Sequence, residues 1–156
     1  MTPAESRALC DAILASPGDA IVMCDREGAI RFWNRGAERI FGFTSAEALG
    51  QSLDMIIPEP QRARHWEGFD RVMATGRSRY GEGDVMAVPA LHRDGRRISV
   101  EFTIAPIRDG QGVMTAMAAI LRDVTARFEE LRALRRRAAV AASAVQTQGS
   151  RETCPP

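Results

Sequence analysis

The sequence predicts an α+β fold: a five-stranded antiparallel sheet with helices packed on one face and a further helix at each end of the chain. Five segments have strand composition, and glycine-containing turns join neighbours among them into hairpins. A long amphipathic segment separates the second strand from the third. The expected strands span residues 20–25, 29–34, 83–91, 97–107 and 113–124.

The composition is that of an ordinary globular protein, with 45% hydrophobic and 26% charged residues, and 156 residues predict one domain with short extensions. A net charge of +1 argues against a nucleic-acid partner. The three cysteines are odd in number and far apart, so we expect neither disulfides nor a metal site. Without a signal-peptide pattern or an apolar run of about 20 residues, we expect a cytoplasmic chain with no membrane partner.

Residues 1–16 are expected to form an N-terminal leader helix. Thr2 and Glu5 have the spacing of a capping box at its start. Leu9 and Ile13 then share one face of the helix. This apolar face is a candidate dimer contact.

The first two strands form a hairpin, after which Asn34 is placed to cap a helix. Alternation in the second strand puts Arg31 and Trp33 on the face opposite Ile30. Two interpretations of Trp33 stay open. It is either a covered core residue or part of an outer sheet face that docks the leader helix of the same or a second chain, giving a homodimer.

The long helix is expected over residues 61–75, where an apolar stripe should lie across the sheet. Pro89 cannot donate a ladder hydrogen bond, so its strand should lie at a sheet edge. Residues 113–124 are almost wholly apolar, as in a strand buried against both neighbours.

The last strand ends at a helix start, where Asp123 and Thr125 can satisfy free helix N–H groups. The helix should span residues 126–145, with apolar positions near heptad spacing and Arg135 at one core position. Residues 146–156 are expected to be a disordered tail.

Four motifs occur in order: Asp25-x-x-Gly28-x-Ile30-x-x-Trp33-Asn34-x-x-Ala37-Glu38-x-x-Phe41-Gly42-Phe43, Ile57-Pro58-Glu59-Pro60-x-Arg62-x-x-His65, Arg93-Asp94-Gly95 and Arg122-Asp123-Val124-Thr125. Over about residues 12–126 they resemble the PAS domains, small sensory modules of bacterial signalling proteins. The resemblance implies the PAS fold over residues 17–125, the strand order 2-1-5-4-3, and a signal relay through Asp123 and Thr125 to the C-terminal helix.

The resemblance also implies a ligand pocket between the long helix and the sheet, although ordinary core packing is the simpler interpretation of the methionines in this set. Glu101 faces away from such a pocket. The implied pocket residues are Phe69, Val72, Met73, Met86, Val88, Phe102, Ile104 and Met117.

Neither of the family's best-known cofactors is favoured. Haem-binding members hold iron through a histidine in or just after the long helix, where the matching places here hold Val72 and either Arg79 or Tyr80, although tyrosine can ligate iron. The photoactive flavin type needs a cysteine in a helix that Cys10 and Cys24 do not supply. His65 is interpreted as a packed structural residue.

The resemblance therefore implies a stand-alone sensor that responds to a small ligand or partner and acts on an effector in trans, such as a histidine kinase. The alternative is a ligand-free dimerisation or interaction scaffold. An enzyme is the weakest hypothesis, because no nucleophile, base and orienting group occur together.

Overall fold

The computed structural model describes residues 1–76 and 86–149, with side chains as far as residue 142. Predictions for Arg79, Tyr80, the start of the third strand and residues 150–156 lie outside the described residues. The elements are α1 (Pro3–Leu14), β1 (Ala20–Asp25), β2 (Ile30–Trp33), α2 (Arg35–Phe41), α3 (Ser45–Ala48), η1 (Leu53–Met55), α4 (Glu59–Thr75), β3 (Met86–Leu91), β4 (Arg97–Arg108), β5 (Met114–Asp123) and α5 (Thr125–Gly149).

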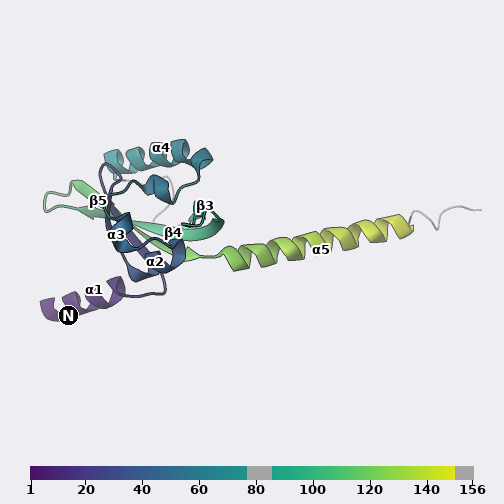
Figure 1. The fold of residues 1–156 in the computed structure, drawn as a ribbon, viewed down its shortest axis with the longest axis horizontal. Helices are drawn as coiled ribbons and strands as arrows, with labels where there is room; N and C mark the ends of the chain where they lie inside the picture. Colours follow the sequence, from purple (N-terminus) through teal and green to yellow (C-terminus); the bar gives the residue numbers. More distant parts are fainter. Residues whose placement is uncertain (77–85, 150–156) are drawn as a thin grey trace, which may run out of the picture. The chain divides into compact units, whose positions relative to one another are not determined.

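The five strands form one antiparallel sheet in the predicted order, β2-β1-β5-β4-β3. Figure 1 labels β3, β4 and β5 of this sheet. β3 is an edge strand, and its Pro89 lies opposite Ser99 of β4. The edge position deduced from the missing N–H of proline is therefore confirmed. β5 lies between β1 and β4, so the strand that ends at Asp123 is held on both sides.

The central strand is not covered on both faces. Met117 and Leu121 of β5 are buried, but Ile120, on the opposite face, is 43% exposed. The nearly unbroken apolar run correctly indicated a central strand, but it did not indicate that one face of that strand is open.

A β-bulge corrects the prediction for Trp33. In the register, Met23 pairs with Phe32 and Cys24 pairs with Ile30, so Arg31 is an extra residue in β2. The bulge turns Trp33 to the same side as Ile30, and Trp33 is only 3% exposed. Trp33 is therefore a core residue, and the expectation that it forms part of an exposed dimer face is wrong.

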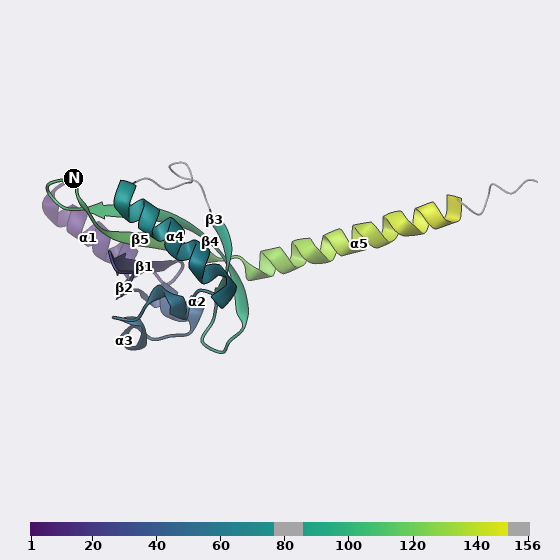
Figure 2. The same ribbon diagram turned by 90° about the horizontal axis from the view of Figure 1, so that it is seen from above.

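One hydrophobic core joins the helices to the sheet. Figure 2 shows α4 lying along the sheet, with α2 and α3 beside it. The core takes residues from α2, α3, α4 and the short η1 turn, and from every strand. Its largest buried members are Ile30, Trp33, Ile40, Phe41, Leu53, Ile56, Phe69, Met73, Ile98, Met114, Met117 and Leu121.

The helix starts follow the local signals in the sequence. Thr2 and Glu5 form the expected capping box on α1, and the Asn34 side chain caps α2 by accepting from the Ala37 N–H. In the ranges 1–76 and 86–149, no helix has the length and apolar character needed to cross a membrane.

The chain divides into two compact units, Met1–Asp123 and Val124–Pro156. In the second unit, α5 begins at Thr125, one residue before the expected start, and the Phe128 N–H donates to the Val124 carbonyl at 2.9 Å. α5 runs to Gly149 rather than to residue 145, because nothing in residues 146–148 breaks a helix before the glycine. The prediction that the tail begins at residue 146 is therefore wrong.

Candidate functional site

Most of the predicted pocket residues lie in or against the core beneath α4. Val88, in contrast, is 39% exposed, and Met86 is half-buried. The other six fill the space between α4 and the sheet, so any ligand there would have to displace or repack apolar side chains. Of these six, Phe69, Val72, Met73 and Met117 are buried, and Phe102 and Ile104 pack against them.

A cavity of about 220 Å³ lies at the C-terminal end of α4, and of the eight predicted pocket residues only Met73 lines it. Two arginines that the sequence did not single out form part of its wall. Arg108 donates to the carbonyls of Gly76 at 3.1 Å and Gly112 at 3.0 Å, and Arg26 donates to the Met114 carbonyl. Arg108 thus ties the end of α4 to the β4–β5 turn, and Arg26 ties the β1–β2 turn to the start of β5.

His65 is the one histidine of α4, and its ring lies among aromatic side chains. The ring centroid is 5.0 Å from that of Trp66 and 6.0 Å from that of Phe69. Burial lowers the pKa of His65, against a weaker opposing effect of Asp54, so the imidazole is neutral at pH 7. Its Nδ1 atom is buried and has no hydrogen-bond partner in the structure as described, and the same holds for Oε1 of Gln61, one helical turn earlier.

Trp66 and Arg62 fasten the start of α4 to the segment before it. The Trp66 Nε1–H donates to the Asp54 carboxylate at 2.9 Å, and Arg62 donates to the carbonyls of Asp54 and Ile57, both at 3.1 Å. The Trp66 ring also lies directly over Gly28, where an added Cβ would come within 2.3 Å of it. The Pro-x-Arg-x-x-His stretch therefore has a structural role that is visible without a ligand.

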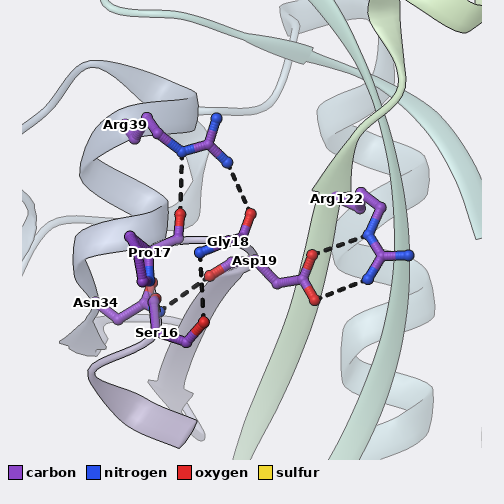
Figure 3. A network of polar contacts seen from close by, with 7 residues as sticks. All are labelled: Ser16, Pro17, Gly18, Asp19, Asn34, Arg39 and Arg122. Carbon is purple, nitrogen blue, oxygen red and sulfur yellow. Dashed lines mark hydrogen bonds and ion pairs between the residues drawn. The ribbon is translucent and has the colours of Figure 1, made fainter. Parts of the chain in front are cut away.

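A second group of polar contacts surrounds the segment between α1 and β1 (Figure 3). The Asn34 amide donates to the carbonyls of Ser16 and Asp19, both at 3.0 Å. Arg39 donates to the carbonyls of Pro17 at 3.0 Å and Gly18 at 2.7 Å. Two side chains, those of Asn34 and Arg39, thus bind the four consecutive carbonyls from Ser16 to Asp19. Asn34 caps α2, and Arg39 lies within α2.

The Asp19 side chain reaches the end of β5. Its two carboxylate oxygens accept from Nε and Nη2 of Arg122, each at 2.9 Å (Figure 3). These hydrogen bonds from Arg122 hold the pKa of Asp19 below its ordinary value. The ion pair is therefore intact at neutral pH, and it is lost as the pH falls through this lowered pKa and the carboxylate is protonated. The sequence did not reveal this pair, because its members are 103 positions apart.

Arg122 immediately precedes the predicted relay residues. Asp123 is the last residue of β5 and lies opposite Val100 of β4, and Thr125 is the first residue of α5. The predicted junction is therefore a strand end followed directly by a helix start. The contact from Arg122 to the segment after α1 adds a partner that the sequence did not indicate.

The model of a protein family described as PAS fold matches residues 14–129 of the chain. Among curated relatives, sensor protein FixL of Bradyrhizobium diazoefficiens is 32% identical over 99 residues, which is 63% of this chain and 19% of that protein. The histidine-protein kinase AtoS of Escherichia coli is 28% identical over 128 residues, 82% of this chain and 20% of the kinase. The oxygen sensor protein DosP of Escherichia coli is 27% identical over 86 residues, 55% of this chain and 11% of that sensor.

Among solved structures, a PAS domain from Colwellia psychrerythraea superposes with a TM-score of 0.67 at 24% identity, covering 78% of this chain and 98% of that domain. This likeness concerns the fold. The chain spans no more than a fifth of the three curated relatives' lengths, so each match concerns one segment of the relative and not the whole protein.

Proposed function

Because this chain belongs to the PAS fold family, we propose that it is a cytoplasmic sensory module that detects a small ligand or a protein partner. Its relatives include sensors and a signalling kinase, which support a role in signal sensing. Binding would change the packing of α4 on the sheet and move β5. The Asp123–Val124–Thr125 junction would pass that movement to α5. The proposal assigns no catalytic step to the chain.

The observation that carries the proposal is that α4 and β5 share one core. Phe69 and Met73 of α4 are buried in the same cluster as Met117 and Leu121 of β5. Interiors are packed as densely as organic crystals, so an added ligand there cannot be absorbed without movement of neighbouring side chains. Leu121 is two residues from Asp123, so the strand end lies close to the point at which packing would change.

For the output, we propose a homodimer that acts on an effector in trans, such as a histidine kinase. Leu9 and Ile13 of α1, which were predicted to form a dimer face, are each 50% exposed. Phe128 and Leu131 of α5 are also exposed and three residues apart, the spacing of one coiled-coil seam. Pairing of α1 or α5 with a second copy would cover these apolar side chains.

The junction can be tested with Asp123→Ala. Removal of one helix-start carboxylate is expected to cost only about 1 kcal/mol of stability. It is nevertheless expected to change the oligomeric state or the response to a partner, because it alters the coupling between β5 and α5. Analytical ultracentrifugation would measure the oligomeric state. Pull-down with a candidate histidine kinase would measure partner binding. A folded variant with unaltered assembly and partner binding would contradict the relay role.

Two other functions have specific support. Four of the predicted pocket residues already fill the core, which favours a ligand-free dimerisation scaffold. The DosP relative is named as an oxygen sensor, which favours a haem-based gas sensor. Amino-acid side chains alone do not bind dioxygen, whereas haem iron held by a histidine does. His65 is the candidate ligand, because its imidazole is neutral and its buried Nδ1 has no partner among the described residues, and a haem there would have to displace the Trp66 and Phe69 rings that pack against it.

One experiment separates these functions: absorbance and mass spectra of the purified protein, followed by thermal melting with added metabolites. A haem absorbance band lost in His65→Ala but retained in His92→Ala would favour the gas sensor. Another bound molecule, or a melting shift of several degrees with one metabolite, would support the proposed sensor. If the purified protein carries no ligand, dimerises tightly and keeps the same melting temperature with every metabolite, the result would support the ligand-free dimerisation scaffold.

A further inference from the structure

The segment between α1 and β1 is fixed at every residue, although it carries no regular secondary structure. Each carbonyl from Ser16 to Asp19 accepts a hydrogen bond from Asn34 or Arg39. The carbonyl oxygen of the same Asn34 amide also binds β1, since Oδ1 accepts from the Ile21 N–H at 2.8 Å. A single side chain therefore connects the segment, the start of β1 and the start of α2.

Asp19 is also in direct contact with the α2 backbone. A Cβ added to Gly36 would lie 1.9 Å from the Asp19 carbonyl oxygen and 2.5 Å from its carbonyl carbon. The chain there leaves no room for even a methyl group. The Asp19 backbone therefore cannot move closer to α2, and the Asp19 carboxylate extends from this packed backbone to Arg122.

The Asp19–Arg122 pair is the connection from this segment to β5. Its geometry is bidentate, with two contacts of 2.9 Å, but the Asp19 and Arg122 side chains are 34% and 70% exposed. Exposed ion pairs stabilise a fold only weakly, so this pair contributes little to overall stability. A pair of this strength can break and re-form during a conformational change at little cost in free energy.

We infer that the Asp19–Arg122 pair couples the leader helix α1 to the end of β5, so that movement of α1 acts on the same junction as a ligand beneath α4. A homodimer formed through the exposed face of α1 would then influence the output directly. This inference rests on the proposed function only in taking the Asp123–Val124–Thr125 junction as the output. The coupling between α1 and the end of β5 requires no ligand.

The test is a double-mutant cycle on the full chain, read by hydrogen exchange of the amides in residues 118–131. Ala15→Pro perturbs the leader, because proline disfavours helical geometry at Leu14 and frays the last turn of α1. With Arg122 present, we expect Ala15→Pro to raise exchange at the junction about threefold or more. In the Arg122→Gln or Asp19→Ala background, Ala15→Pro should add nothing further.

The matched control is the Arg93–Glu47 pair, which has a contact of 2.7 Å and side chains 53% and 39% exposed. Arg93→Gln removes a similar ion pair far from the junction in sequence, and in that background the effect of Ala15→Pro should persist. The coupling would be refuted if Ala15→Pro left the junction unchanged with Arg122 present. Equal effects of Ala15→Pro with and without the pair would refute it as well.

This outcome is separable from the proposed function. The cycle uses protein without ligand, so failure to find a ligand leaves its result intact. If the cycle succeeds but Asp123→Ala changes neither assembly nor partner binding, the coupling stands and the junction is not the output. If the cycle fails while Asp123→Ala alters the output, the relay stands and α1 does not act through Asp19.

Discussion

Trp33→Ala is expected to lower the free energy of unfolding by about 3–5 kcal/mol. Trp33 is 3% exposed, its ring centroid lies 5.3 Å from that of Phe41, and its Nε1–H donates to the Phe43 carbonyl at 3.0 Å. Truncation would leave a large cavity and an unpaired carbonyl in the core. Urea unfolding, followed by circular dichroism at two protein concentrations, measures the loss.

Two controls show whether the effect belongs to the core. Trp33→Phe keeps an aromatic ring but loses the donor, so a smaller loss is expected. Leu9→Ala alters a side chain that is 50% exposed and should change the free energy of unfolding by less than about 0.5 kcal/mol. If Trp33→Ala kept the unfolding midpoint and weakened only dimerisation, Trp33 would belong to an interface after all.

Gly36→Ala is expected to destabilise the protein by about 1–3 kcal/mol or more, because the new methyl group would meet backbone atoms of Asp19 at 1.9 and 2.5 Å. The gain in helix propensity, about 1 kcal/mol at most, does not offset this clash. The displaced Asp19 should also lose its contacts with Asn34 and Arg122. Thermal melting, together with hydrogen exchange of residues 16–22, would detect both effects.

Gly68→Ala is the matched control for this glycine. Gly68 is inside α4, and an added Cβ would have no atom within 4 Å, so the substitution should stabilise by up to about 1 kcal/mol. Equal melting temperatures for Gly36→Ala and Gly68→Ala would mean that the backbone before β1 moves away from the new methyl group at little cost in free energy. In that case the rigid placement of Asp19 would be wrong.

The sequence predicted those features that depend on nearby residues. The capping box of Thr2 and Glu5 and the cap at Asn34 each involve partners within a few positions, and α5 starts within one residue of the expected start. The edge position of β3 also followed from one residue, since Pro89 lacks an N–H wherever it lies. The strand order came from the family resemblance and is confirmed.

The candidate site was predicted only in part. Six of the eight pocket residues do lie in or against the core beneath α4, because the apolar stripe of α4 and the alternation of β4 follow regular periods. Val88 is exposed, and the cavity at the end of α4 is lined by Arg26 and Arg108, which have no periodic or motif signal. The orphaned Nδ1 of His65 likewise depends on surroundings that spacing does not reveal.

By itself, the sequence determined the helix caps, the strand segments, the edge position of β3 and the junction at Asp123 and Thr125. Tertiary structure alone decided the side to which Trp33 turns, because one bulged residue, Arg31, reverses the alternation of β2. It also decided that Asp19 meets Arg122 across 103 positions. Local signals specify partners a few residues away, whereas sheet register and long-range ion pairs are set only when the whole core packs.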